Sequence, residues 1–328
     1  MSNIEAKLLT LLVKTEGSSY GTDPTPTVGS NAVMPRSFKD DPNIAEVEKP
    51  RVDAKHRTVG KQIASVSIPI EVEFELVGHA TAGTAPQFGP ILKAAGMTET
   101  VSANTSVAYA YNSLAAQGSV TMYAYKYQLG GAGASLLHKY HGVRFGALEI
   151  SGGVDAPFVI KTMGEGLFGG TEDATPTVAS LSFTDEILDG ANGKACTFTV
   201  GGVSTDIKSF SLKTNREAMR RDSIVGTYGV KEVFVTASPG SVHEITLDRE
   251  VQLKADHDHW SRMLADTTKF AWSLAWSTPG GSTVTIAGPK LQEGSFSYND
   301  DGILRLDQTF YACDDADTGD DALTIVFT

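Results

Sequence analysis

Residues 64–77 read Ala-Ser-Val-Ser-Ile-Pro-Ile-Glu-Val-Glu-Phe-Glu-Leu-Val, and this run predicts one long β-strand. Apolar and polar residues alternate along it, which is the pattern of a strand with two different faces. The polar face carries Glu71, Glu73 and Glu75. Pro69 cannot donate a ladder hydrogen bond, so we expect an edge, a bulge or a bend there. The apolar face carries Val66, Ile68, Ile70, Val72, Phe74 and Leu76.

The rest of the chain has the same strand-and-turn character. Further strands are predicted at 119–128 and 269–277. Helical patterns are scarce, and the sequence favours short helices only at 86–95, at 258–266 and in part of the N-terminal segment. These patterns predict a mainly β fold. Glycine pairs that mark turns stand at 130–131, 152–153, 201–202 and 280–281.

Length, charge and cysteine content limit the possible functions. The 328 residues are enough for two domains of ordinary size. The 39 acidic residues outnumber the 27 basic ones, which gives a net charge of −12 and argues against adhesion to the DNA backbone. An acidic protein is still compatible with a position near DNA to which it must not adhere. The two cysteines, Cys196 and Cys313, are too few for a disulfide framework or a thiolate metal cluster.

The sequence predicts neither a membrane anchor nor an export signal. No stretch approaches the ~18 consecutive apolar residues of a membrane span. The short apolar run at 8–13 lacks the basic region and the small-residue cleavage site of a signal peptide. We therefore expect no contact with a membrane and a protein that stays in a reducing compartment.

The two halves of the sequence share an order of features, which indicates an internal repeat. The strand at 64–77 has a counterpart at 245–253, and each is followed by an apolar helix pattern, an aromatic strand and a closing hairpin. Chance similarity between two alternating sequences is the alternative. The residues that match in spacing are Phe88 and Trp260, Ile91 and Met263, Leu92 and Leu264, and Phe38 and Phe210.

The repeat predicts two tandem copies of one β-sandwich or barrel-like domain, each with a short flanking helix. The first domain would span residues 1–168 and the second residues 181–328. Residues 169–180 contain a Gly-, Thr- and Pro-rich stretch that is typical of a linker. The closing hairpins are expected at 143–163 and 291–312.

The sequence Asp-His-Asp-His at 256–259 has two interpretations. A metal site would need further ligands that converge on it, and the sequence does not supply them. The cluster lies at the start of the helix pattern at 258–266, so the carboxylate of Asp256 or Asp258 is well placed to cap that helix. The capping interpretation is favoured.

Two other motifs resemble binding loops only in part. The acidic run at 314–321 lacks the Glu and the flanking helices of an EF-hand, so a solvated loop is favoured over a cation site. The glycine-rich run at 130–135 lacks the ending of a phosphate-binding loop, and we expect a hairpin tip followed by a return strand at 136–139. The sequence holds no His-Glu-x-x-His motif. We therefore expect neither an enzyme nor a cofactor.

The acidic face of the strand at 64–77 is the most informative feature. Three carboxylates on one strand face repel one another unless water solvates that face. A solvated outer face of a sandwich is one interpretation. The other is a strand that lines a water-filled lumen, where carboxylates repel a polyanion and let it slide. Asp248 and Glu250 keep part of this character in the second half, so the candidate lumen-facing residues are Glu71, Glu73, Glu75, Asp248 and Glu250.

Two stretches of the first half are distinctive as whole motifs. Residues 11–27 read LLVKTEGSSYGTDPTPT, and residues 81–96 read TAGTAPQFGPILKAAG before a stretch rich in Thr, Val and Tyr. Both stretches resemble the major tail tube proteins of long-tailed, non-contractile bacteriophages. The second half is similar to that family only through the internal repeat and its general β character.

The resemblance implies a structural protein of the virion tail that assembles in the host cytoplasm. Family members commonly have one domain and form hexameric rings, whose stacking makes a tube that conducts DNA. With two domains in each chain, three copies would form a pseudo-sixfold ring. The implied partners are other copies of the chain and the tape measure, tail terminator and distal tail proteins, while DNA passes without specific binding. The polar segments 17–62 and 204–232 would be arms that contact the next ring.

A two-domain β-sandwich binding module is the alternative function, as an adhesin or a carbohydrate-binding protein at a virion tip or cell surface. Exposed aromatic residues would then stack on sugars, and Trp272 and Trp276 are the candidates. Both share a strand face with Phe270 and Leu274, which favours a place in the core.

Overall fold

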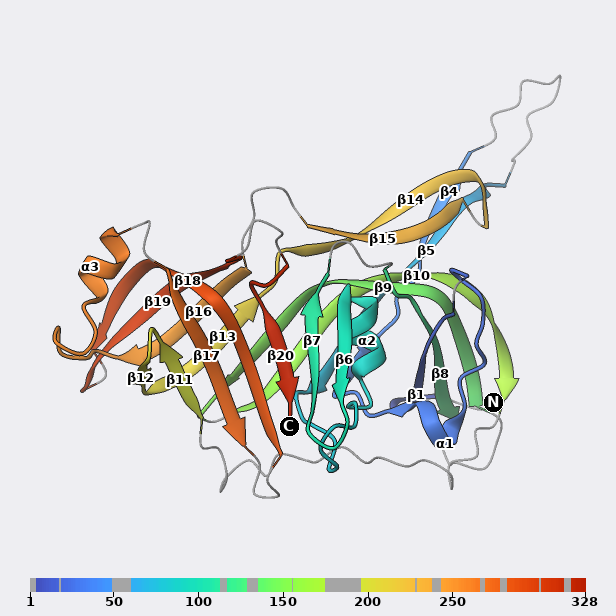
Figure 1. Cartoon of the computed structure of the whole chain (residues 1–328). Coiled ribbons are helices and arrows are strands. Elements are labelled where there is room, and N and C mark those ends of the chain that lie inside the picture. The colour runs from blue at the N-terminus through green and yellow to red at the C-terminus, as the bar shows by residue number, and fades with distance from the viewer. Residues whose placement is uncertain are drawn as a thin grey trace.

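The computed structural model describes most of the chain and consists mainly of β-strands (Figure 1). Strands make up 67% and helices 6%, which confirms the predicted mainly β class. Within the described part of the chain, no helix has the length and apolar composition needed to cross a bilayer. The described residues are 4–17, 19–48, 60–112, 117–128, 135–154, 156–174, 196–227, 229–237, 243–265, 269–277, 282–300, 302–315 and 320–328.

The strand predicted at 64–77 is β5 (Gln62–Glu75), and its alternation gives it one buried face. The apolar residues from Ile68 to Leu76 are buried, as predicted. β5 pairs with β10 along one edge and with β4 and β3 along the other. Pro69 lies in the gap between the β4 and β3 pairings, as its missing donor predicts. The partners are β3 (Ser37–Lys39), β4 (Asn43–Val47) and β10 (Ala156–Ala174).

A first set of six antiparallel strands has the order β1-β8-β9-β10-β5-β3. The apolar run near the N-terminus lies in β1, and the described part of the N-terminal segment holds one short helix, α1. Leu11 and Val13 lie in the main core and Leu12 in a smaller one, so the continuous apolar run belongs to a strand buried on both faces. The further strands of this set are β1 (Ile4–Thr15), β8 (Val120–Gln128) and β9 (Ser135–Gly153).

Smaller elements complete the first half. The helix predicted at 86–95 is α2 (Gly89–Ala94), which contacts β1, β8 and β9 and buries Ile91 and Leu92. Next to it stands a β-hairpin formed by β6 and β7. The bounds are α1 (Val28–Asn31), β2 (Ala32–Val33), β6 (Met97–Ser102) and β7 (Ser106–Tyr111).

A second set of six antiparallel strands has the order β11-β17-β18-β19-β16-β13. The helix predicted at 258–266 is α3 (His259–Leu264). The strands of this set are β11 (Thr197–Val200), β13 (Ile207–Lys213), β16 (His243–Glu250), β17 (Phe270–Ser277), β18 (Thr283–Asp300) and β19 (Leu304–Cys313). The other strands of this half are β12 (Val203–Thr205), β14 (Arg216–Thr227), β15 (Val230–Ala237) and β20 (Thr324–Phe327).

The two sets correspond strand by strand, in both chain order and spatial order. The register also matches: Ser37 of β3 lies opposite Glu73 of β5, and Ser209 of β13 lies opposite Asp248 of β16. In each half a short helix follows the β5 or β16 strand, and a long hairpin closes the set, β9–β10 in the first and β18–β19 in the second. Glu73 and Asp248 therefore occupy corresponding positions.

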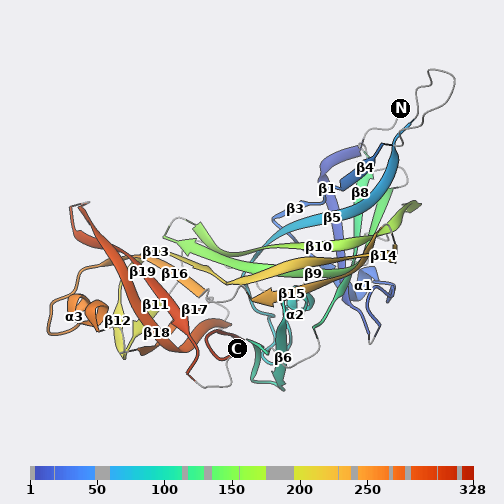
Figure 2. The ribbon, with the colours of Figure 1, turned by 90° about the horizontal axis from the view of Figure 1, so that it is seen from above.

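The two sets are joined by strand pairing into one continuous structure (Figure 2). The C-terminal end of β9 pairs with β13, with Ser151 opposite Ser211. β20 makes a second connection, because it pairs with β7 of the first half and with β18 of the second. Phe158 of the first set stacks on Trp276 of the second, with ring centroids 4.2 Å apart. One hydrophobic core consequently extends through both halves.

The β14–β15 hairpin crosses over the first strand set (Figure 1). The side-chain amide of Gln117 donates a hydrogen bond to the carbonyl of Val235 and accepts one from the backbone nitrogen of the same residue. Arg144 donates to the carbonyl of Val233. A Cβ on Gly146 would lie 2.6 Å from the backbone nitrogen of Ala218, so glycine is required for this close approach. Part of the segment 204–232, predicted to be an arm, thus docks on the first half of its own chain.

The stretch predicted as a linker at 169–180 begins inside a strand. β10 continues to Ala174 and pairs with β9 over residues 170–174. β9 is long enough to supply a pairing partner for these residues. Residues 175–195, which hold the rest of the predicted linker, lie outside the described part.

The contact of Phe158 with Trp276 gives a test of the junction between the sets. Phe158 is 2% exposed, whereas Leu304, at the corresponding position of the second set, is 49% exposed. We expect Phe158→Ala to lower the free energy of unfolding by about 3–5 kcal/mol. Leu304→Ala is the matched control, with an expected change within about 0.5 kcal/mol. Equal effects of the two changes in urea unfolding would contradict the assigned junction.

Candidate functional surface

A row of charged side chains of alternating sign crosses five neighbouring strands. The row runs from β5 through β10, β9 and β13 to β16, so it passes over the junction between the two sets. Directly opposite residues of opposite charge attract one another, so the row favours this register. All members are exposed or half-buried, on the sheet face that points away from the core. The charged row consists of Glu73, Lys161, Glu149, Lys213 and Glu244.

The five predicted acidic residues lie on this same face, and each has a basic partner. Lys161 Nζ lies 2.7 Å from Glu71 Oε1, and this contact raises the pKa of Lys161. Arg36 lies 3.3 Å from Glu73 and 3.0 Å from Glu75. In the second set, Arg305 bridges Asp248 at 2.5 Å and Glu250 at 3.4 Å. The five predicted acidic residues therefore belong to a network of ion pairs that remains accessible to solvent, and they do not form a row of unpaired carboxylates.

The rest of the surface consists largely of small polar side chains. Beside the charged row, Ser151, Ser211, Thr246 and Thr309 lie opposite one another in adjacent strands. An open groove of about 760 Å³ lies where the two sets meet. Acidic side chains outnumber basic ones on this face, so its field repels a polyanion. Outside the charged row, the acidic residues of this face include Glu71, Glu75, Asp248, Glu250 and Asp307. The basic residues include Arg36, Lys39 and Arg305.

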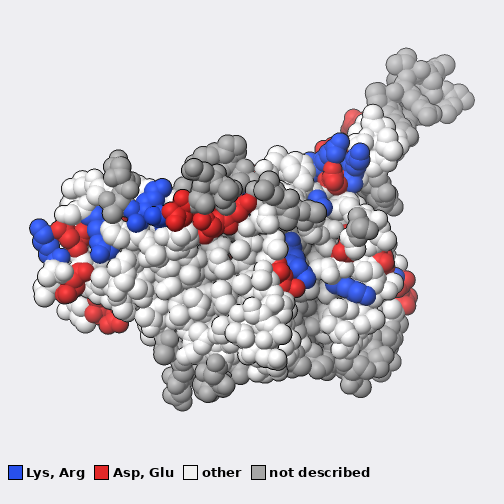
Figure 3. Space-filling view, in the orientation of Figure 1, with Lys and Arg blue, Asp and Glu red and all other residues white. Residues whose placement is uncertain are grey.

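The face of the molecule formed by β6, β7, β17 and β20 has a different chemical character from the face that carries the charged row. In the space-filling view, the broad face over β6, β7, β17 and β20 is largely uncharged, and charged side chains gather along its upper edge (Figure 3). The two sides of the molecule are therefore suited to different surroundings.

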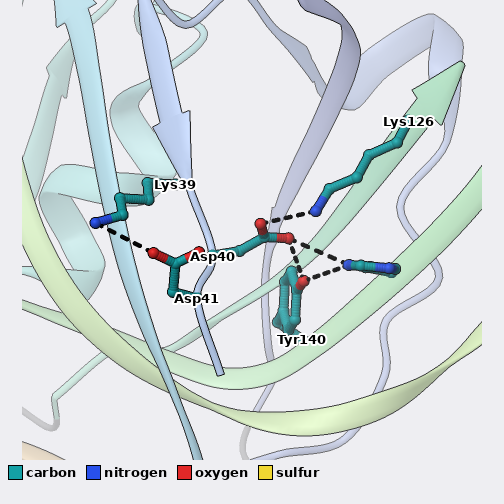
Figure 4. A network of polar contacts seen from close by, with 6 residues as sticks. Lys39, Asp40, Asp41, Lys126 and Tyr140 are labelled. Carbon is teal, nitrogen blue, oxygen red and sulfur yellow. Dashed lines mark hydrogen bonds and ion pairs between the residues drawn. The ribbon is translucent and has the colours of Figure 1, made fainter. Parts of the chain in front are cut away.

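Asp40, at the end of β3, anchors this edge strand to the strands β8 and β9 (Figure 4). Its carboxylate lies 2.7 Å from Lys126 Nζ and 3.2 Å from His138 Nδ1, and it accepts a hydrogen bond from Tyr140. Burial raises the pKa of Asp40, but the hydrogen bonds from His138, Lys126 and Tyr140 outweigh burial and lower it to about 2. The network holds in place β3, on whose outer side no other described strand pairs.

Removal of the Asp40 carboxylate should cost stability in a pH-dependent way. The pKa of Asp40 falls from its ordinary 3.8 to about 2 on folding, so its contribution is present above pH 3.8 and is lost as the pH falls through 2. We expect Asp40→Asn to lower the free energy of unfolding by about 2 kcal/mol at pH 7, and by much less at pH 2. Asp41→Asn, at an exposed ion pair with Lys39, is the control. A pH-independent loss would contradict the assigned role.

The cluster at 256–259 caps a helix, as favoured by the sequence. Asp258 Oδ1 accepts a 3.0 Å hydrogen bond from the backbone nitrogen of Ser261 at the start of α3. His257 turns inward, and its Nε2 lies 3.0 Å from Oε1 of the buried Glu293. Burial raises the pKa of Glu293, but contacts with His257 and Gln308 outweigh it and lower the pKa. The described residues hold no group of three or more His, Cys, Asp or Glu side chains placed to bind a metal ion.

The acidic run at 314–321 and the return strand at 136–139 have structural roles in the residues that the structure describes. Asp314 Oδ1 accepts hydrogen bonds from the backbone nitrogens of Asp321 and Ala322, so this acidic loop binds its own backbone. The strand predicted at 136–139 pairs with β8, which confirms a return strand. The tip at 129–134 and the loop residues 316–319 lie outside the described part.

Trp272 and Trp276, the candidates for a sugar-stacking platform, are buried in the core. Trp276 packs against Phe158 across the junction, and Leu274 between them is also buried. The preference of the sequence for a core position is confirmed, and these two rings are not available to a sugar.

Comparisons with known proteins do not identify this chain. No protein-family model and no curated protein sequence matches it.

The sequence identified the acids of the surface but missed the bases that pair with them. Lys161, Lys213 and Arg305 stand on strands whose register could not be read from composition alone. The glycines at 152–153 were expected to form the turn, but they belong to β9: Ser151 lies opposite Val159, and Glu149 therefore lies opposite Lys161.

Proposed function

We propose that this chain is the structural subunit of a bacteriophage tail tube of the long-tailed, non-contractile type. The observation that carries the proposal is the pair of strand sets with the same order, joined edge to edge into one sheet. A sheet that already continues from one set into the next can continue further into another copy of the chain. Such an arrangement pairs the edges that an open β-domain otherwise exposes.

We infer that the two sets are tandem copies of one domain and that three chains form a pseudo-sixfold ring. The matching order, the matching register at Ser37 and Ser209, and the corresponding helices support the duplication. A closed ring built from two-domain chains contains an even number of domains, and three chains supply six. Rings that stack then form the tube.

The polar sheet face would line the lumen, with Glu71, Glu73, Glu75, Asp248 and Glu250 turned towards the passing DNA. Two properties support this assignment: acidic side chains are in excess, and each basic side chain near the predicted acids is held in an ion pair. Among the described residues of this face, DNA phosphates would find no stripe of unpaired basic side chains to adhere to, and the duplex would slide. The role is structural, in the virion, with the tape measure, tail terminator and distal tail proteins as further partners.

Electron microscopy with mass measurement tests the proposed function. We expect the purified protein at high concentration to form rings or tubes with a central channel, and each ring to have the mass of three chains. Rings of six chains would retain the tube but contradict the pseudo-sixfold arrangement. A chain that stays monomeric under all conditions would contradict the proposal and favour a binding module, for which a glycan-binding screen is the next step.

The charge of the polar face can be tested without breaking its ion pairs. Ser211 and Thr246 lie opposite each other on this face. We expect tubes of the Ser211→Lys/Thr246→Lys protein to retain double-stranded DNA that enters them at low salt, and to release it as salt rises. The Ser211→Gln/Thr246→Gln protein, similar in size but uncharged, should behave as the unchanged chain does. No difference in DNA sedimentation between the two variants would contradict a lumen position.

A further inference from the structure

Corresponding residues of the two strand sets differ sharply in exposure at one end of the molecule. Ile150 and Phe158 of the first set are 0% and 2% exposed, because the second set covers them. Tyr298 and Leu304, at the corresponding positions of the second set, are 51% and 49% exposed. Burial at one end and exposure at the other mark a surface from which an equivalent neighbour is missing.

An aromatic end surface surrounds these exposed residues. Trp260 of α3 packs edge-on against Phe296, with ring centroids 4.9 Å apart, and its indole nitrogen donates a 3.2 Å hydrogen bond to the Tyr298 hydroxyl. Leu264 of the same helix is 72% exposed, whereas the matched Leu92 of α2 is fully buried. The end surface consists of Trp260, Leu264, Phe296, Tyr298 and Leu304.

The strand next to the end surface has a free edge. Residues 296–300 of β18 pair with β19 on one side, and no described strand pairs with their other side. The corresponding residues of β9, by contrast, are paired on both sides, with β10 and with β13. Free ladder groups beside exposed aromatic side chains favour the addition of another strand.

The complementary free edge lies at the opposite end of the same chain. β3 pairs with β5 on one side only, within the described strands, whereas the corresponding β13 pairs with both β16 and β9. The Asp40 network holds β3 in place, so the edge is formed before any partner binds.

We propose that β3 of one copy adds antiparallel to the free edge of β18 of a second copy, and thereby covers the aromatic end surface. The register follows from the internal junction: Ser211 lies opposite Ser151 within the chain, so Lys39 of one copy lies opposite Asn299 of the next. The inference rests on the proposed correspondence of the two sets, but it does not require that the resulting assembly stack into a tube or conduct DNA.

Cysteine cross-linking tests this junction residue by residue. In a background with Cys196→Ser and Cys313→Ser, one full-length protein carries Lys39→Cys and another carries Asn299→Cys. Mild oxidation of the mixture should give a covalent dimer that contains one chain of each kind. A protein that carries both changes should give a ladder that ends at three chains. The positive control is Ser151→Cys/Ser211→Cys, which should form a disulfide inside a single chain.

The outcomes separate this junction from the proposed function. Dimers of the Asn299→Cys protein with itself would indicate a two-fold contact and overturn the proposal, as would tubes without any cross-link between Lys39→Cys and Asn299→Cys chains. Specific cross-links in a protein that never forms tubes would support the junction and contradict the tail tube function.

A second pair of variants tests the end surface without the use of cysteine. Tyr298→Lys/Leu304→Asp places charges on residues that are half exposed in the single chain and removes one surface hydrogen bond from Trp260, so its melting temperature should fall only slightly. We expect its assembly to require at least tenfold higher protein concentration. Val101→Asp, at an equally exposed apolar residue of β6, should assemble as the unchanged chain does. Equal assembly by both variants would overturn the proposal.

Discussion

Edge-to-edge strand pairing is the constraint on which the rest of the structure depends. Every unpaired backbone group at a strand edge must find a partner or water. Where the two sets meet, the partner strand belongs to the same chain, because β13 pairs with the end of β9. Phe158 packs against Trp276 across this junction. At the ends of the molecule, the corresponding edges of β3 and of the end of β18 have no such partner among the described strands.

The polar face depends on that junction. The charged row alternates in sign only because the pairing of β9 with β13 places Glu149 opposite Lys213. A shift of one residue would turn these side chains towards the core, where unpaired charges are very costly. The arrangement of charges on this face therefore depends on the register of the junction between the two sets.

Local patterns predicted the parts of the fold that local physics controls. The alternation of β5 and the cap of Asp258 on α3 were readable, because each depends on neighbours in the sequence. The N-terminal strand was not predicted, since a continuous apolar run has no strand period when both faces are buried. The Asp40 network joins residues 86 to 100 positions apart, and the ion pairs of Glu71 and Asp248 depend on strand register, so no local pattern contained them.

A cryo-electron microscopy reconstruction of the assembled protein tests the central claim most directly. We expect a threefold ring of six similar domains, in which β3 of each chain pairs with β18 of the next and the charged row faces the central channel. A ring in which these two edges remain in solvent, or in which the charged row faces outward, would contradict the proposed assembly.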